Sequence, residues 1–97
     1  MAKYIVLMNL TEQGIKDIKS APDRVKAQER ALEAAGSKLL EFYLTMGPYD
    51  YVAITEGPGD EVAMTQLLAL GAGGNVRTTT LKAFTLDEFE GMLKNLP

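Results

Sequence analysis

The spacing of the apolar residues changes several times along this 97-residue chain, and that change most constrains its fold. Residues 3–10 are a short apolar run rich in β-branched and aromatic side chains, which is typical of a strand. From Thr11, a plausible N-cap, apolar residues recur at helical spacing as far as Gly36, which has the position of a helix-ending glycine. Pro22 interrupts this stripe and predicts a kink, or a short helix followed by a longer one.

The middle of the chain predicts a β-hairpin. Residues 38–46 and 51–56 are strand-like and flank Gly47-Pro48-Tyr49-Asp50, in which Pro48 suits the second position of a tight turn. A second helix is expected from Pro58 to the glycine cluster at 71–74.

The last quarter predicts a strand and a short helix. Residues 75–84 contain three consecutive threonines and favour a strand. Thr85 and Glu88 have the spacing of a capping box, which opens a C-terminal helix that we expect to pack back on the domain.

The predicted order, βαββαβ with a terminal helix, is the ferredoxin-like arrangement of the α+β class. In it, four antiparallel strands carry both long helices on one face. Residues 1–97 fit one domain, because a single core typically takes roughly 100–200 residues. The chain is 46% hydrophobic and 24% charged, a balance typical of folded proteins.

Composition excludes several classes of function. Ten basic residues are scattered among thirteen acidic ones, so no basic stripe favours nucleic acid. With no Cys and no His, the chain lacks a thiolate, a disulfide, a histidine base and the usual zinc and haem ligands, and we expect no metal and no cofactor. The N-terminal apolar run is about half the roughly 20 residues of a membrane span, which predicts a cytoplasmic protein without a membrane partner.

Neither face of the predicted sheet is polar. With Leu44 opposite Val52, we expect the even-numbered hairpin residues under the helices and the odd-numbered ones on an aromatic, hydroxylated outer face. The two sets are Leu40, Phe42, Leu44, Val52 and Ile54, and Leu39, Tyr43, Thr45, Tyr51, Ala53 and Thr55, with Glu41 as the only charge on the second face. The first strand divides likewise into Tyr4, Val6 and Met8 against Ile5 and Leu7.

A second copy of the sheet is the economical cover for such an outer face, because two-fold self-association is the commonest oligomer. The sequence therefore predicts a homodimer formed through the sheet faces. The alternative is that short strands simply tolerate exposed Tyr and Thr side chains.

Four separated segments carry a family resemblance: Tyr43–Val52, Gly74–Leu81, Thr11–Lys16 and Pro22-Asp23-Arg24. The first contains Gly47, Tyr49 and Asp50, which match the residues that name the GYD-domain family, and the chain resembles that family over essentially its whole length. The resemblance implies a dimeric α+β barrel in which two ferredoxin-like sheets face each other, and it implies no particular activity.

Other likenesses are narrower. The hairpin is similar to a turn in the ligand-binding domain of leucine-responsive transcriptional regulators, but no helix-turn-helix is attached here. Other dimeric α+β barrels include cofactor-independent oxygenases, isomerases and haem-handling proteins, and several of these use a histidine that this chain lacks.

Tyr43, Tyr49, Asp50 and Arg77 are the candidate ligand-binding residues. Asp50 beside a phenol could orient a polar ligand or act as a base, or it could close the turn by accepting backbone N–H bonds. The tyrosines could line a space between two sheets or serve as core and interface aromatics.

Two arginines and a glycine run likewise have two interpretations each. Arg77, like Arg24, could bind a carboxylate in a pocket or form a surface ion pair. The run at 71–75 could present N–H groups to an anion, but it lacks the Lys-Ser or Lys-Thr of a P-loop, which favours a plain connection.

Two hypotheses of function follow. The first is a non-catalytic homodimer that binds a small molecule in a cavity near the sheet, lined by Tyr, Thr and Arg77. The second is a cofactor-independent enzyme, oxygenase- or isomerase-like, that handles protons with Tyr49 or Tyr43 and Asp50. A pocket that converges on a Tyr–Asp pair with a raised carboxylate pKa would favour the enzyme.

Overall fold

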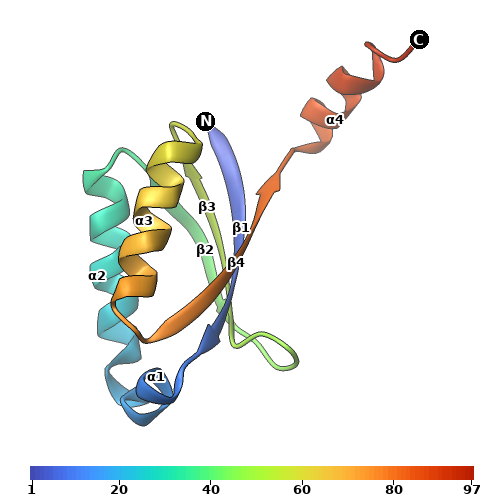
Figure 1. Ribbon diagram of the computed structural model, residues 1–97. Coiled ribbons are helices and arrows are strands. Elements are labelled where there is room, and N and C mark those ends of the chain that lie inside the picture. The colour runs from blue at the N-terminus through green and yellow to red at the C-terminus, as the bar shows by residue number, and fades with distance from the viewer.

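A computed structural model describes all 97 residues as one antiparallel sheet that carries its two long helices on one face (Figure 1). The α+β class and the βαββαβ order predicted from the sequence are confirmed. The elements are β1 (Ala2–Leu10), α1 (Glu12–Lys16), the 3-10 turn η1 (Ile18–Ser20), α2 (Ala21–Ala34), β2 (Lys38–Leu44), β3 (Tyr51–Gly57), α3 (Asp60–Ala72), β4 (Val76–Ala83) and α4 (Leu86–Leu93).

The first strand is the centre of the sheet. The strand order is β2-β3-β1-β4, and β1 pairs antiparallel with both β3 and β4. Ile5 lies opposite Ile54 on one side and Leu81 on the other, which puts three aliphatic side chains in a row on the face away from the helices.

The helical segment after β1 breaks where Pro22 predicts. Thr11 caps α1 by accepting a hydrogen bond from the Gly14 N–H, and the chain then passes through η1 before α2 begins, with Pro22 in its first turn. Gly36 follows α2 with φ of 80°, the left-handed conformation that favours glycine. These boundaries agree with the sequence signals.

The hairpin register differs from the predicted one by a residue. Leu44 lies opposite Tyr51, not Val52, and the ladder shifts between Leu39 and Glu41. The alternation within β3 is therefore opposite to the prediction: Tyr51 and Ala53 are buried toward the helices, and Val52 and Ile54 lie on the outer face. A slip of one residue exchanges the two faces of a strand, because side chains alternate with a period of two.

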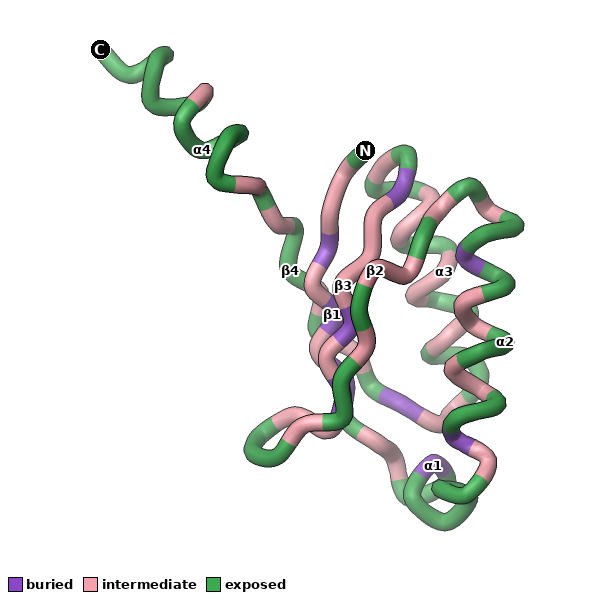
Figure 2. Tube along the Cα trace, turned by 180° about the vertical axis from the view of Figure 1, so that it is seen from behind, coloured by how far each residue is buried: buried purple, intermediate pink, exposed green.

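The C-terminal helix forms as predicted but does not pack back. Thr85 and Glu88 make the complete capping box, with the Glu88 N–H donating to the Thr85 side chain at 3.1 Å. Helix α4 extends away from the sheet beyond the end of β4 and contains no buried residue (Figures 1 and 2). Its Leu86, Phe89 and Leu93 side chains are exposed because no other element of the chain covers them.

The core is small and lies on the helix side of the sheet. Its buried members come from three strands and are Tyr4, Val6, Met8, Tyr51, Ala53 and Val76. Helix α2 lies against β2 and α3 against β4, the two edge strands. The helices therefore lie over the edges of the sheet and leave a space above its central strands.

Candidate functional site

An apolar cavity of about 350 Å³ lies between the helices and the sheet. Residues of α2, α3 and all four strands line it, and most of them are hydrophobic. Phe42 and Tyr51 form part of its wall as a tilted aromatic pair, with ring centroids 5.0 Å apart. The volume is within the usual range of small-molecule pockets.

A few polar groups interrupt the apolar lining. Gln28 on α2 and Gln66 on α3 line the cavity from the two helices, and Arg24 lines it from the first turn of α2. The Thr80 hydroxyl is buried in the wall without a hydrogen-bond partner. Since buried hydroxyls nearly always have a partner, this oxygen marks a place in the wall where a polar atom would be stabilised.

The Arg24 guanidinium makes hydrogen bonds to the chain through only one of its three nitrogens. Its Nη1 donates to the Asp17 backbone oxygen at 2.9 Å and to the Asp17 carboxylate at 3.1 Å. The Nη2 and Nε groups make no hydrogen bond to the protein. Asp17 is exposed and does not line the cavity, so Arg24 lies between a surface acid and the apolar interior.

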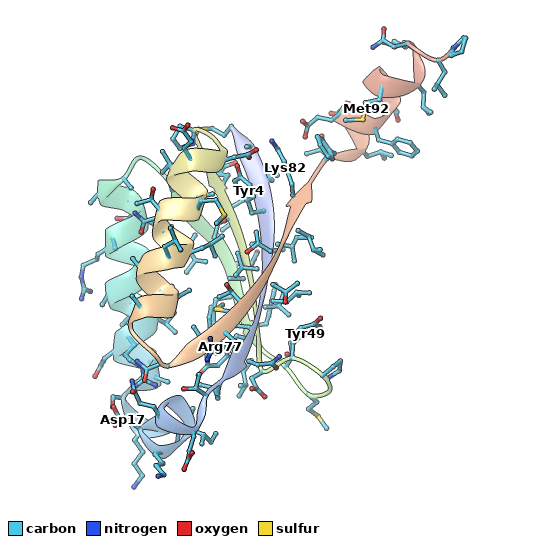
Figure 3. The ribbon with its side chains drawn as sticks, in the orientation of Figure 1. Tyr4, Asp17, Tyr49, Arg77, Lys82 and Met92 are labelled. Carbon is cyan, nitrogen blue, oxygen red and sulfur yellow. The ribbon has the colours of Figure 1, made fainter.

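A tyrosine, an aspartate and a lysine form an ionic cluster beside this cavity. The Tyr4 hydroxyl donates to the Asp60 carboxylate at 2.6 Å, and the Lys82 ammonium lies 3.0 Å from the same carboxylate. Tyr4 and Lys82 are neighbours on β1 and β4 (Figure 3). The three residues also line a second, smaller hollow of about 240 Å³.

The pKa values in this cluster move apart. The hydrogen bond to Asp60, burial and the nearby negative charge raise the pKa of Tyr4 to about 12. The hydrogen bonds from Tyr4 and Lys82 lower the pKa of Asp60. The phenol is therefore held protonated and the carboxylate ionised, which is a structural arrangement rather than that of an acid or base ready to exchange protons near neutral pH.

Asp50 forms its hydrogen bonds with backbone groups. Its carboxylate accepts the Leu10 N–H at 2.8 Å, and its own N–H donates to the Met8 carbonyl at 2.8 Å. The Thr45 N–H donates to the Asp50 carbonyl, also at 2.8 Å, and closes the hairpin loop. Asp50 therefore fastens the loop to the end of β1, and no hydrogen bond joins its carboxylate to Tyr49.

The other candidates do not converge in one chain. Tyr43 lies on β2 and Arg77 on β4, the two edges of the sheet, so three strand spacings, roughly 14 Å, separate their strands. Both side chains are exposed, and the Tyr43 hydroxyl donates to Glu41 at 3.1 Å, which raises the pKa of Tyr43. Tyr49 lies in the hairpin loop, and its carbonyl accepts from Thr45 (Figure 3). None of these residues lines the cavity.

The glycine-rich run at 71–75 accepts hydrogen bonds from the start of α1 through its carbonyl oxygens. The Gly74 carbonyl accepts from the Thr11 hydroxyl at 2.6 Å, and the Gln13 amide donates to the Gly73 carbonyl at 3.0 Å. The Thr11 N–H donates to the Asn75 carbonyl at 3.0 Å. These carbonyls point toward donors of the chain itself, which supports the connection rather than an anion site. Two of the segments that carry the family resemblance thus meet here.

No cluster of three or more acidic side chains lies close enough to hold a metal ion. None of the helices is both long and apolar enough to span a membrane.

Fold and site together define a small α+β protein with a ferredoxin-like sheet and an apolar cavity beneath its helices. The chain belongs to the GYD domain family, whose profile matches residues 4–93, as the sequence resemblance predicts. A curated relative is the "Glutamine synthetase and cystathionine beta-lyase binding protein" of Thermus thermophilus. It is 32% identical over 95 residues, which cover 97% of this chain and 100% of the relative.

The sequence predicts a cavity near the sheet, but not its position beneath the helices, and it does not predict the ionic cluster. Asp60 lies at the start of α3, where the sequence suggests only a helix-capping role, but its carboxylate binds Tyr4 and Lys82 from two other elements. Tyr4 and Lys82 are 78 positions apart, so only the β1–β4 register brings them together. A polar tip on an otherwise apolar strand is the one signal that points to Tyr4.

Proposed function

We propose that this protein is a non-catalytic homodimer that binds a larger protein, a metabolic enzyme. The observation that carries the proposal is apolar surface left without a cover on two separate parts of a small chain, half-buried to exposed on one and exposed on the other. One part is the outer face of the sheet and the other is helix α4. The relative named as a binding protein for two metabolic enzymes supports the same class of function.

The outer sheet face fits self-association. Its centre is a continuous group of aliphatic side chains from three adjacent strands: Ile5, Leu7, Val52, Ile54 and Leu81. Lys3 and Glu56 form an ion pair at 3.2 Å on the same face, and Tyr43 and Arg77 lie at its edges. An apolar centre with a polar rim is the usual anatomy of a protein interface.

Helix α4 fits a second role, in binding the enzyme partner. It projects from the body of the protein (Figure 1) and carries Leu86, Phe89 and Leu93, spaced by three and four residues, on one side. An amphipathic helix presented in this way can lay its apolar side in a groove of another protein. The cytoplasmic location predicted from the sequence agrees with a metabolic enzyme as the partner.

Binding should be tested with purified glutamine synthetase and purified cystathionine beta-lyase from the organism that supplies this chain. Surface plasmon resonance with either enzyme immobilised is expected to show saturable binding of the parent protein. Phe89→Ser should weaken it at least about tenfold, because one large apolar anchor is lost from the helix. Glu90→Ser, at the neighbouring position, is the matched control and should bind as the parent does.

Two results would contradict this proposal. The first is no binding of the parent to either enzyme at concentrations where the protein is dimeric. The second is equal binding by the parent and Phe89→Ser, which would remove α4 from the interface.

The cavity favours a second function, the binding of a small molecule. Its site differs from the one expected from the sequence, because it lies under the helices and is bordered by Phe42 and Tyr51 rather than by Tyr49, Asp50 and Arg77. An alcohol of ten carbons, decanol, is a suitable neutral probe of its apolar lining. Calorimetric titration should show one site per chain, and Ala53→Leu, which adds bulk to the cavity wall, should weaken binding.

The alternative of a proton-transferring enzyme has no comparable support. Asp50 is used by the Leu10 N–H, and no tyrosine hydroxyl donates to it. The Tyr–Asp pair that does form, Tyr4 with Asp60, has a lowered rather than a raised carboxylate pKa.

A further inference from the structure

Two charged residues border the cavity, Glu56 and Arg24, and they differ in how far other groups of the chain pair with them. Glu56 borders the end formed by the last residues of β3, but the register places its side chain on the outer face, where Lys3 neutralises it at 3.2 Å. Arg24 lies at the opposite end, where α2 begins after the chain has left β1. Two of its three guanidinium nitrogens make no hydrogen bond to the chain, so this end offers unused N–H donors and a positive charge.

The cavity extends along most of β1. Its lining runs along β1 from Tyr4 to Leu10, six residue steps or roughly 20 Å. A volume of about 350 Å³ gives room for roughly a dozen groups of water or methylene size, at about 30 Å³ each. A linear ligand of about ten carbons with one small head group matches both the length and the volume.

We propose that the cavity binds a medium-chain monocarboxylate, with the alkyl chain along β1 and the carboxylate on Arg24. This inference rests on the small-molecule function proposed above and names its ligand class. The carboxylate would accept from Nη2 and Nε of the guanidinium while Nη1 keeps its bonds to Asp17. The alkyl chain would contact Val6, Met8 and Leu67.

The head group is tested by three probes with the same alkyl chain: decanoate, decanol and decylammonium. Isothermal titration at pH 7.5, below the micellar concentrations, is expected to show decanoate binding about tenfold tighter than decanol. Decylammonium should bind more weakly than decanol, because Arg24 repels it. Arg24→Gln should abolish the preference for decanoate while retaining the binding of decanol.

Matched variants separate the cavity from the rest of the surface. Arg77→Gln removes the same charge from the outer face and should leave the preference for decanoate unchanged. Ala53→Leu fills the cavity and should weaken all three probes, whereas Ala72→Leu, at the exposed end of α3, should not. Thermal unfolding of each variant shows that it has folded before it is titrated.

Each other outcome has a definite meaning. Equal binding of decanoate and decanol by the parent would overturn the carboxylate assignment and leave the small-molecule function standing. Absence of binding by all three probes would overturn both. Loss of decanoate binding in Leu81→Glu, with Ala53→Leu unaffected, would place the ligand on the outer face and overturn the cavity assignment.

Discussion

Single residues in this protein mostly serve the fold, including those that most resemble catalytic groups. Asp50 ties the hairpin loop to β1, and Asp60 ties α3 to two strands through Tyr4 and Lys82. Each of these carboxylates accepts hydrogen bonds from donors within the chain, which gives it a role in holding elements together. Arg24 differs, because part of its guanidinium remains unused.

Removing the Asp50 carboxylate should destabilise the protein. Asp50→Ala loses the bond from the Leu10 N–H, and a charge-assisted bond of this kind contributes on the order of 1–2 kcal/mol. Asp50→Asn keeps one acceptor and should lose less. Denaturant unfolding measures both variants, with Glu90→Ala in exposed α4 as the charge-matched control.

An Asp50→Ala protein that unfolds later than its parent would contradict the role of Asp50 in fastening the loop. The hairpin would then be the first place to look for a ligand that needs its charge.

The link between Tyr4 and Asp60 should make stability depend on pH in the alkaline range. The pKa of Tyr4 is about 12 in the folded protein and about 10 when unfolded, so folding favours the protonated phenol. The contribution of the protonated Tyr4 phenol to the free energy of unfolding is complete below pH 10 and is lost as the pH rises from 10 toward 12. Urea unfolding at pH 8, 10 and 11 should show the stability difference between the parent and Tyr4→Phe shrinking in that window.

The comparison with Tyr4→Phe is needed because lysines also lose their charge in this range. A stability difference that stays constant from pH 8 to 11 would mean that Tyr4 has no raised pKa. Ultraviolet titration of Asp60→Asn provides a second measurement, in which the late-titrating phenol should move toward pH 10.

At the scale of elements, local signals placed the helix and strand ends well, while contacts between elements set their positions. The junction of α1 with the loop before β4 is an example. Gly14 is buried there, and a Cβ on it would overlap the Asn75 carbonyl oxygen. Its role is close approach rather than an unusual backbone angle.

Gly14→Ala should therefore destabilise the protein by about 1–3 kcal/mol, because α1 must move away from Asn75. Gly71→Ala is the matched control, since it lies within α3 and its added methyl would meet no atom. It should stabilise by about 0.4–1 kcal/mol through the higher helix propensity of alanine. Thermal unfolding of the two variants should shift in opposite directions, and a shift in the same direction would contradict the close contact.

At the scale of the whole molecule, the chain is elongated. Its radius of gyration is 14.8 Å and its extents are 53 × 31 × 18 Å, whereas about 13 Å is typical of a compact domain of this length. Helix α4 produces much of this length, because it stands away from the sheet (Figure 1). The outer sheet face and α4 together are the surfaces on which the proposed assembly depends.

The dimer prediction belongs to this scale. Sedimentation at low micromolar concentration should show a species of twice the 10.6 kDa chain mass, because a standard interface of roughly 1,600 Å² gives stable association. Leu81→Glu places a charge on the exposed outer face and should shift the protein toward the monomer. Thr79→Glu places the same charge on the same strand and face. It tests whether the shift toward the monomer requires a charge within the apolar centre.

A parent protein that sediments as a single 10.6 kDa species would contradict the homodimer. A Leu81→Glu protein that remains dimeric would instead place the interface elsewhere, with α4 as the next surface to examine.

Much of this fold could be predicted from the amino-acid sequence. The order of elements, the break at Pro22, the helix end at Gly36 and the capping box at Thr85 all follow from residues only a few positions apart. The composition contains no His and no Cys, and this excludes thiolate, disulfide and histidine-base chemistry. Family membership was also within reach, because its segments can be matched in order along the chain.

The faces of β3, the direction of α4 and the location of the cavity depend on long-range geometry. The hairpin register sets the faces of β3: with Leu44 opposite Tyr51 rather than Val52 the two faces are exchanged, since side chains alternate at every residue. Helix α4 has an apolar side, as a packed helix does. The spacing of its apolar residues does not show which surface that side packs against. The cavity exists because α2 and α3 lie over opposite edges of the sheet, an outcome of packing that no local run of residues encodes.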